Sequence, residues 1–367
     1  MREVVIDEGA YRSADQVHAH LKGALSLPEY YGANLSALAD CLEDIDQPTC
    51  IRTLDPAMPI SAELADFYRR LRAVLERCAA HNPLLTVIVG EPREEPGTRG
   101  GLAQPAVVGV AQCQHPADGN VVALVERFAE RARERGADLL VFPENLMTPY
   151  ELPAEEFCAR AQTLEGPFCR AVDDVARRFG LWLIYTANEA NPHGRPFNTA
   201  VVTDSSGRQR GSYRKVHLFD VGRYRESDKT AAGSGPFAPI ATPAGMVGLG
   251  VCYDLRFPEL ARTLALAGAQ VLVFPSAWVD GPGKLRHWET LLAARAIENE
   301  VFTVGCCRCD RGYLGQSRIY GPTGECLAAG GDGEELLCAP LDLSQVEQAR
   351  HAIPVLAHRR PDLYGNS

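Results

Sequence analysis

Residues 136–145 read GADLLVFPEN, and residues 268–277 repeat the same plan as GAQVLVFPSA. In each stretch a glycine suited to ending a helix precedes an unbroken apolar run and then a proline. Such a run is typical of a strand that is buried on both faces. The repeat predicts two halves built on one plan, with the ends of both strands around one shared centre. A packing motif without functional meaning is the alternative.

The repeat also pairs Glu144 with Ser276, because the two residues hold the same place in their stretches. One half carries a carboxylate where the other carries a hydroxyl, which suggests that only one strand end does the chemistry. Glu144 is therefore a candidate for catalysis, and Ser276 is a candidate for substrate binding.

Strands and helices alternate around these two stretches. Apolar runs that read as strands occupy residues 107–114, 181–189, 246–254 and 301–309, and stretches that read as helices occupy residues 120–136, 166–180, 257–268 and 287–300. The alternation predicts an α/β fold with large sheets that are covered on both sides.

The composition excludes several classes of protein. The chain has 367 residues, of which 46% are apolar and 23% are charged, and its formal net charge is −10. This balance is globular, and the acidic total argues against nucleic acid as a partner, which needs a basic face. No stretch approaches the ~20 apolar residues of a membrane helix. The start, MREVVIDEGAYRS, lacks the basic residues and apolar run of a signal peptide. We expect a cytoplasmic chain with no membrane partner.

Twelve cysteines without a secretion signal indicate reduced thiols rather than disulfides. Cys306, Cys307 and Cys309 crowd together, but no CxxC pair or histidine pair at metal-ligand spacing accompanies them. We expect these three to be core thiols of a strand, because a free cysteine packs like a small apolar residue. The sequence predicts no metal site.

Residues 91–105 read EPREEPGTRGGLAQP, a mixture of proline, glycine and charge that is typical of a linker. The linker divides the chain into a domain of residues 1–90 and a domain of residues 106–367. Residues 1–95 carry 16 acidic and 9 basic side chains, so most of the acidity lies in the smaller part. A solvated surface is the ordinary explanation for such charge.

Three residues of the larger domain stand at places where α/β proteins build their sites. Glu144 follows a buried strand, Lys215 lies in SYRKVHLFD after a strand and turn, and Cys252 lies between a strand and a helix. Polar groups at the carboxyl ends of buried strands commonly form such sites. A nearby helix N-terminus favours the thiolate form of a cysteine. Taken singly, each residue also has an ordinary structural explanation.

The segments FPEN, RKVHLFD and GVCYDLRFPEL resemble the three catalytic blocks of the nitrilase, or carbon–nitrogen hydrolase, superfamily. RHWETLLAARAIEN and SRIYGPTGECLA resemble its later structural blocks. The resemblance covers nearly all of residues 106–367. It implies a four-layer αββα sandwich and a homodimer or higher homo-oligomer.

The same resemblance implies a role for each block. Cys252 would be the nucleophile and Glu144 the general base, while Lys215 and the backbone N–H of Tyr253 would stabilise the oxyanion. Glu226, in RYRESDK, matches the second glutamate of the superfamily. The chemistry agrees, because an amide carbon is a poor electrophile that needs a strong nucleophile and a stabilised oxyanion. No metal or organic cofactor is required.

The CYDLRFPE segment, together with HWE at 287–289, resembles the branch of ω-amidases and deaminated-glutathione amidases. That branch acts on small amides of dicarboxylic or 2-oxo acids. Arg256 would face the substrate carboxylate, since arginine binds carboxylates through a bidentate fork. An ion pair with Glu259 or Asp254 is the alternative. The loop VDGPGKLR (279–286) would border the entrance.

The segment LPEYYGANLSALADCLEDI resembles barstar, the ribonuclease inhibitor, and the resemblance extends over residues 1–90. It implies a small three-stranded parallel sheet with helices. Tyr30 and Asp40 match residues of the inhibitory face. Ser36 replaces an acid and Ala39 replaces a tryptophan of that face, and Arg69 falls where another acid belongs. We therefore expect a poor inhibitor of barnase-type ribonucleases.

The sequence thus predicts a thiol amidohydrolase that releases ammonia from a small linear amide bearing a carboxylate. An N-carbamoyl amino acid amidohydrolase is one alternative. The other is a barstar-like partner-binding or ribonuclease-inhibitor protein in which the hydrolase is a scaffold, and the intact set of Glu144, Lys215 and Cys252 argues against it. The barstar-like domain would bind a different protein partner, or it would pack on the hydrolase and order its oligomer.

Overall fold

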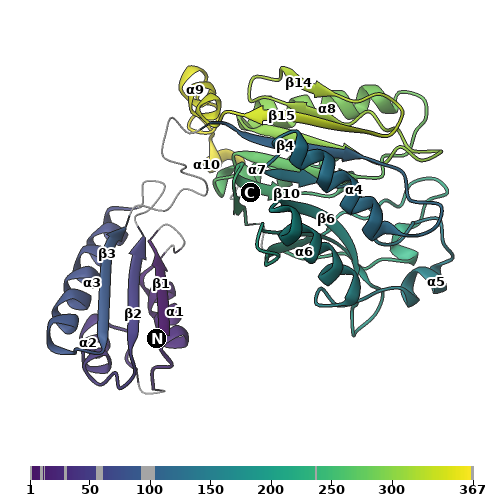
Figure 1. Ribbon diagram of the computed structural model, residues 1–367. Coiled ribbons are helices and arrows are strands. Elements are labelled where there is room, and N and C mark those ends of the chain that lie inside the picture. The colour runs from purple at the N-terminus through teal and green to yellow at the C-terminus, as the bar shows by residue number, and fades with distance from the viewer. Residues whose placement is uncertain are drawn as a thin grey trace. The chain divides into compact units, whose positions relative to one another are not determined.

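The computed structural model describes residues 2–8, 11, 13–28, 31–54, 61–91, 104–235 and 238–364. The chain divides into two compact units, residues 1–98 and 99–367 (Figure 1). Each unit has its own sheets and its own hydrophobic core, so each is described by itself.

The small unit is a three-stranded parallel sheet with helices, as the barstar resemblance implies. Its elements are β1 (Arg2–Asp7), α1 (Ala14–Leu25), α2 (Leu35–Glu43), β2 (Thr49–Leu54), α3 (Ala62–His81) and β3 (Leu85–Glu91). The strands lie in the order β1-β2-β3. Ser13, Asn34 and Ser61 cap the three helices by accepting a hydrogen bond from a backbone N–H of the first turn. The sequence patterns predict both outer strands but not β2.

The large unit contains two six-stranded mixed sheets. The first has the order β15-β4-β5-β6-β7-β8 and the second β14-β13-β12-β11-β10-β9. The first sheet comprises β4 (Ala106–Gln112), β5 (Leu139–Val141), β6 (Trp182–Glu189), β7 (Phe197–Thr203), β8 (Gln209–Arg214) and β15 (Glu335–Leu341). The second comprises β9 (Ile240–Thr242), β10 (Gly245–Leu249), β11 (Val271–Ser276), β12 (Phe302–Cys307), β13 (Arg318–Tyr320) and β14 (Cys326–Ala329).

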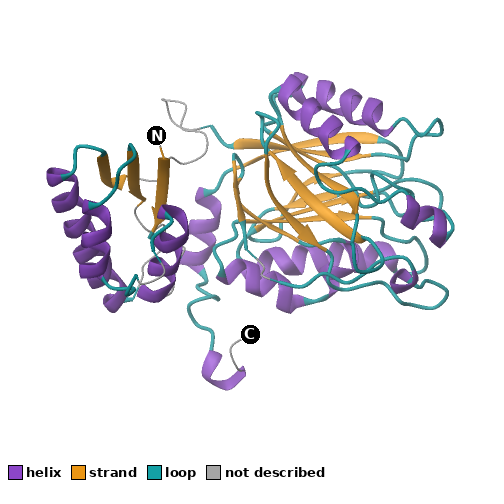
Figure 2. Cartoon of the chain, turned by 90° about the horizontal axis from the view of Figure 1, so that it is seen from below, coloured by secondary structure: helices purple, strands orange, loops and turns teal. Residues whose placement is uncertain are grey.

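Helices cover the outer face of each sheet, which gives the predicted αββα order (Figure 2). The helices are α4 (Val121–Glu134), α5 (Ala154–Ala159), α6 (Pro167–Phe179), α7 (Pro258–Leu266), α8 (Lys284–Asn299), α9 (Ser344–Ala352) and α10 (Pro361–Tyr364). One apolar cluster packs α4 and α6 on the first sheet. A larger cluster fills the space between the sheets and continues to α7 and α8. Two short 3₁₀ helices, Glu226–Asp228 and Cys252–Arg256, carry further site residues.

The repeated stretches form the central strands β5 and β11. Each pairs in parallel with a strand on either side, and every residue of both strands is buried. Their ends meet across the two sheets, where the backbone N–H of Ala277 donates to Glu144 Oε2 at 2.8 Å. The two halves therefore do share one centre, as the repeat predicts.

The cysteine cluster is part of the core. Cys306 and Cys307 lie in β12 and are fully buried, and Cys309 is also buried. The Cys306 thiol lies 3.4 Å from the carbonyl oxygens of Ala111 and Val141 in the facing sheet. The three residues therefore pack as core thiols.

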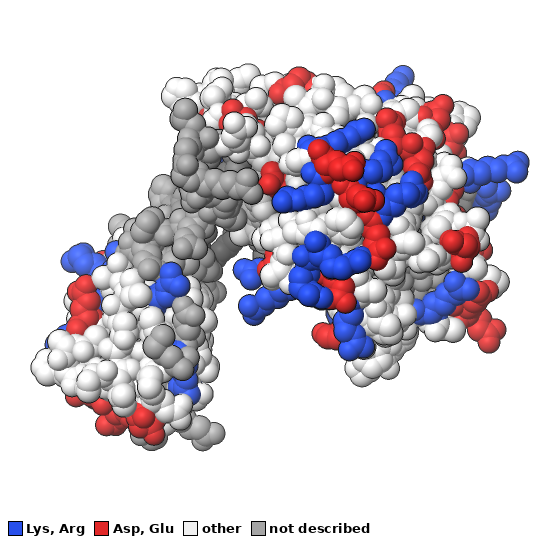
Figure 3. Space-filling model, in the orientation of Figure 1, with Lys and Arg blue, Asp and Glu red and all other residues white. Residues whose placement is uncertain are grey.

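Charges of both signs are intermixed over the face that contains α4 and α6 (Figure 3). There Arg127 pairs with Glu334 and Arg178 pairs with Glu126. This face offers no broad basic surface of the kind that nucleic acid requires. None of the helices in the described ranges is both long enough and apolar enough to cross a membrane.

Candidate active site

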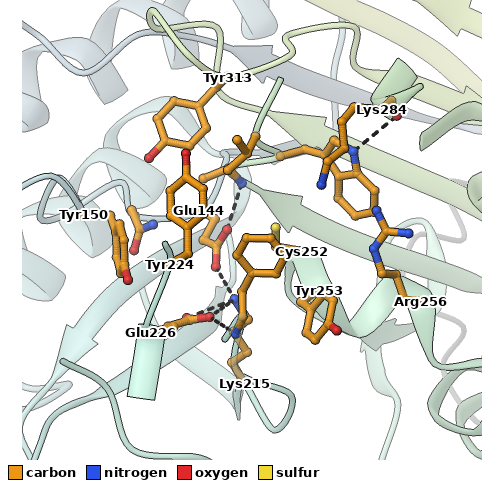
Figure 4. A pocket seen from close by; sticks show the side chains of 15 residues that line it. Glu144, Tyr150, Lys215, Tyr224, Glu226, Cys252, Tyr253, Arg256, Lys284 and Tyr313 are labelled. Atoms are coloured by element: carbon orange, nitrogen blue, oxygen red, sulfur yellow. Dashed lines mark hydrogen bonds and ion pairs between the residues drawn. The ribbon is translucent and has the colours of Figure 1, made fainter. Parts of the chain in front are cut away.

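A cavity of about 510 Å³, counting the space at its mouth, opens beside the ends of the central strands. It is lined by Glu144, Asn145, Tyr150, Lys215, Phe219, Tyr224, Glu226, Cys252, Tyr253, Arg256, Ala277, Trp278, Val279, Lys284 and Tyr313 (Figure 4). Every residue predicted for catalysis or oxyanion binding lies among them. The fold therefore brings residues from five separate segments of the sequence to one place.

Glu144 is held in a fixed orientation by three donors. Lys215 Nζ and Asn198 Nδ2 each lie 2.8 Å from Oε1, and the N–H of Ala277 donates to Oε2. The side chain is buried because it stands just beyond β5, between the two sheets. A carboxylate with this many fixed donors is aligned before any substrate arrives.

Lys215 follows β8 and is fully buried. Besides Glu144, its Nζ contacts both carboxylate oxygens of Glu226, at 2.9 and 2.8 Å. Glu226 also accepts a hydrogen bond from the backbone N–H of Phe219 at 2.7 Å. The ammonium group thus bridges two carboxylates that come from different elements.

Burial and charge act against each other in this cluster. Burial by itself would lower the pKa of Lys215, but Glu144 and Glu226 together raise it well above the ordinary lysine value. The ammonium therefore stays charged. Burial raises the pKa of Glu226, and the charge of Lys215 opposes that rise.

Cys252 begins a short 3₁₀ helix after β10, and its backbone is left-handed, with φ of 47°. This conformation is uncommon for a residue other than glycine and costs of order 1–3 kcal/mol, so the surrounding structure must hold it. Asp254 supplies part of that support. Its Oδ2 accepts from the N–H of Val251 and the hydroxyl of Tyr213, both at 2.8 Å.

The other oxygen of Asp254 accepts from His217, at 2.7 Å from the ring Nδ1 and 3.1 Å from the backbone N–H. Tyr213 and His217 flank Lys215 in the sequence. The buried carboxylate of Asp254 therefore ties the turn that carries the thiol to the segment that carries the ammonium group.

The expectation of a thiolate at Cys252 is wrong for the unliganded protein. Burial raises the pKa of the Cys252 thiol well above its usual value, and the nearby Glu144 raises it further, while Lys215 only partly opposes these effects. The next α-helix begins only at Pro258, too far for its N-terminus to offset them. The raised pKa therefore keeps the thiol protonated near neutral pH.

Arg256 lines the cavity, and its guanidinium carbon lies 4.5 Å from the centre of the Trp278 ring. No ion pair joins Arg256 to Glu259 or Asp254 in the described part of the chain, so the structure does not support that alternative. The loop 279–286 borders the cavity through Val279 and Lys284.

Ser276 does not line the cavity. Its side chain is fully buried, and its hydroxyl donates to the carbonyl oxygen of Phe274 at 3.1 Å. This position gives no support to substrate contact by Ser276. The useful group at this strand end is instead the neighbouring N–H of Ala277, which reaches Glu144.

Residues 106–351 match the family described as carbon-nitrogen hydrolase. The chain belongs to the carbon–nitrogen hydrolase family. The resemblance to the nitrilase superfamily is thereby confirmed, as is the prediction of an enzyme that acts on carbon–nitrogen bonds. Residues 1–87 match a second family, described as barstar (barnase inhibitor).

Relatives of this carbon–nitrogen hydrolase carry amidase names. Deaminated glutathione amidase of Rattus norvegicus is 35% identical over 304 residues, which cover 77% of this chain and 92% of that protein. Omega-amidase NIT2 of Homo sapiens is 35% identical over 249 residues, which cover 65% of this chain and 88% of that protein. Both names fall in the branch that the CYDLRFPE segment indicates.

Solved structures that are similar to this chain also carry nitrilase or amidase descriptions. Nit3 of Saccharomyces cerevisiae, described as a member of branch 10 of the nitrilase superfamily, has a TM-score of 0.63 at 30% identity, covering 71% of this chain and 98% of its own. An amidase from Nesterenkonia sp. AN1, with acrylamide added at its active site cysteine, has a TM-score of 0.62 at 26% identity, covering 71% and 98%.

The barstar-like unit presents one of the two residues predicted for the inhibitory face within its described part. Asp40 is exposed on α2, but Ala39 is buried in the core of the unit, so it offers no anchor to a partner. Arg69 pairs with Asp66 on α3, which offsets the charge expected to repel a basic partner. Tyr30 lies outside the described residues.

Several residues of the hydrolase site carry no signal in the sequence. Asn198 is an ordinary residue of a strand pattern, and the N–H of Ala277 belongs to a residue without a functional side chain. Trp278 precedes the loop 279–286 and Lys284 lies in it, and the sequence places that loop only near the entrance. A polar residue such as Asn198 on a buried strand is the one sign that could have been noticed.

Proposed function

We propose that the hydrolase is a thiol amidohydrolase that releases ammonia from a small linear amide bearing a carboxylate. The observation that carries this proposal is the position of the protonated Cys252 thiol beside Glu144 and Lys215 in one cavity. In this proposal Cys252 is the nucleophile, Glu144 is the general base, and Lys215 and the N–H of Tyr253 hold the oxyanion.

The acylation step uses the pairing of Glu144 and Cys252. Glu144 takes the thiol proton as the sulfur attacks the amide carbon, so the thiolate forms only when its target is in place. The carbonyl oxygen gains the negative charge, and Lys215 and Tyr253 N–H stabilise it. When the intermediate collapses, the C–N bond breaks, and the leaving nitrogen takes the proton from Glu144 and departs as ammonia.

Deacylation runs through the same base. Glu144 takes a proton from water as the water oxygen attacks the thioester carbon, and the C–S bond then breaks. The sulfur regains the proton held by Glu144, and the acid product gives up its own proton to solvent and leaves as a carboxylate. Glu226 keeps Lys215 charged and in place throughout both steps, since its two oxygens hold the ammonium group.

A carboxylate on the substrate is supported by two observations. Arg256 lines the cavity without an ion-pair partner among the described residues. The relatives named above are a deaminated glutathione amidase and an ω-amidase, and the substrates of both names are amides of acids.

The test is an ammonia-release screen of the full chain over small amides, N-carbamoyl amino acids and nitriles. We expect half-amides of dicarboxylic or 2-oxo acids to be the best substrates, and mass spectrometry to find an acyl adduct on the peptide that contains Cys252. Cys252→Ala should abolish turnover, while Cys326→Ala, at an exposed position on β14, should not. An adduct on Cys306 or Cys307, or turnover of carbamoyl amino acids alone, would contradict the proposal.

We further propose that residues 1–90 and 106–367 are separate domains joined by residues 91–105, and that the hydrolase forms a homodimer. All twelve cysteines are free, which fits a reducing compartment such as the cytoplasm. Light scattering that shows a monomer at micromolar concentration would rule out the dimer. Titration of the full chain against a barnase-type ribonuclease should show no nanomolar inhibition, which would leave the barstar-like domain to a different protein partner.

A further inference from the structure

Two cations share one wall of the catalytic cavity. The Arg256 guanidinium carbon lies 4.5 Å from the centre of the Trp278 ring, and Lys284 Nζ lies 5.9 Å from the same centre. Lys284 Nζ also lies 5.4 Å from the centre of the Phe219 ring. Figure 4 shows Arg256 and Lys284 on one side of Cys252, and Glu144, Lys215 and Glu226 on the other.

Neither cation has a carboxylate partner in the described part of the chain, although both are half-buried. The carboxylates that line the same cavity, Glu144 and Glu226, are already bound to Lys215. Burial lowers the pKa of Arg256, and both burial and the charge of Arg256 lower the pKa of Lys284. Two like charges are therefore held near one another with no carboxylate among the described residues to compensate them.

The protein backbone holds Lys284 in this position. Lys284 is the first residue of α8, and its carbonyl oxygen accepts a hydrogen bond from the indole N–H of Trp278 at 3.3 Å. Gly283, just before it, has a left-handed φ of 74°, which glycine adopts without strain. The loop thus directs Lys284 back over the ring that also carries Arg256.

We propose that Arg256 and Lys284 form a two-cation subsite that binds the carboxylate of the substrate, at the end remote from the amide. Trp278 is the wall of this subsite, and the apolar carbons between the two ends of the substrate lie along it. Arg256 supplies the bidentate fork, and Lys284 supplies a second charge on the same anion. The subsite rests on the proposed function, and it adds Lys284 as a residue that determines specificity.

The physical argument is one of complementarity. An anion that enters between the two cations removes their mutual repulsion and replaces the water that they lose. A neutral amide gains neither effect and leaves both charges uncompensated in a half-buried site. The subsite should therefore select by charge and should act mainly on substrate binding rather than on the chemical step.

The experiment compares two substrates of the full chain: glutaramate, which is the half-amide of glutarate, and neutral pentanamide. Lys284→Gln should lower kcat/KM for glutaramate by roughly 10- to 100-fold, the effect of one charge-assisted hydrogen bond, and change it little for pentanamide. Lys284→Arg should restore most of the preference. Arg286→Gln is the matched control, since Arg286 is exposed on the same helix and does not line the cavity.

An equal loss on both substrates in Lys284→Gln would overturn the subsite. So would a loss that disappears in about 1 M salt, where the screening length is only ~3 Å, because this would reduce the pair to long-range steering. A binding measurement keeps the test separate from turnover. In Cys252→Ala, glutarate should bind more weakly once Lys284→Gln is added, and unchanged glutarate binding would contradict the subsite. Failure of the wild type to hydrolyse any amide would instead count against the proposed function.

Discussion

The two sides of the catalytic cavity hold their cations in opposite states. Lys215 is fully buried, and both of its neighbouring carboxylates lie within 2.9 Å. Arg256 and Lys284 are half-buried and lie against the same ring, that of Trp278, without a carboxylate partner among the described residues. The difference separates two tasks. A cation that the protein pairs with its own carboxylates is a fixed part of the site, whereas a cation without such a partner is available to bind a charged ligand.

The largest effect should come from removing the paired cation. Lys215→Met leaves Glu144 and Glu226 buried together without compensation, so we expect the free energy of unfolding to fall by about 3–5 kcal/mol and activity to be lost. The measurement is calorimetry of the hydrolase transition in the full chain. Adding Glu226→Gln should recover part of the stability but none of the activity.

Lys284→Gln provides the contrast. Its free energy of unfolding should change by no more than about 0.5 kcal/mol, because the variant removes a repulsion rather than an ion pair. If Lys215→Met and Lys284→Gln destabilised the hydrolase equally, the distinction between the two sides of the cavity would not hold.

The second prediction concerns the tie between the thiol and the ammonium group. Asp254→Asn removes the charge that holds Val251, Tyr213 and His217 together, and a small displacement of a catalytic group costs about 100-fold. We expect kcat to fall by roughly that factor with KM little changed, since Asp254 does not line the cavity. The rate of alkylation of Cys252 should change as well.

Glu259→Gln is the control for Asp254→Asn, because Glu259 is exposed a few residues further along. A change confined to thermal stability, with kcat and alkylation both intact, would assign Asp254 a purely structural role.

The third prediction tests the guanidinium fork of Arg256, on the side of the cavity where the cations have no carboxylate partner among the described residues. Arg256→Lys keeps the charge but loses the bidentate geometry, so kcat/KM should fall by roughly 10-fold for acidic amides and less for neutral ones. Steady-state kinetics on glutaramate and pentanamide decide it. Equal losses on the two substrates would make Arg256 a packing residue of Trp278.

The smallest predicted effect concerns the protonation of the Cys252 thiol. Burial and the nearby Glu144 raise the pKa of Cys252, so the fraction of thiolate at a given pH is lower than for a free thiol and grows only at alkaline pH. Alkylation by iodoacetamide at pH 8 should therefore be slower at Cys252 than at the exposed Cys326, and it should accelerate above pH 9. Faster reaction at Cys252 below pH 8 would show that a thiolate is already present.

The sequence predicts the paired side of the cavity far better than the unpaired side. Glu144, Lys215 and Cys252 stand in sequence motifs that are specific to a family. Buried strands fix the backbone position of each of these residues. The roles of Lys284 and Asn198 could not be predicted, although Asn198 stands out as a polar residue on a buried strand, because those roles depend on which residues the fold brings near them. The pKa of Cys252 was predicted in the wrong direction, because burial is a property of the whole fold and not of its neighbours in the chain.

Ser276 shows the limit of an internal repeat. The repeat aligns it with Glu144, but β5 ends at Val141 and releases the chain toward the cavity, whereas β11 continues through Ser276 and keeps that side chain inside the sheet. Equal sequence position therefore did not give equal exposure. The ends of the two stretches do meet one residue later, where the backbone N–H of Ala277 donates a hydrogen bond to Glu144.

At the left-handed backbone of Cys252, selection for folding and selection for the reaction favour different residues. A mutation to glycine or asparagine would fit that backbone with less strain, so a lineage that needed only a folded protein would be free to drift away from cysteine. A lineage that needs the reaction is confined to the residue that the backbone accommodates poorly. We therefore expect that descendants without the activity would lose the cysteine at this turn early.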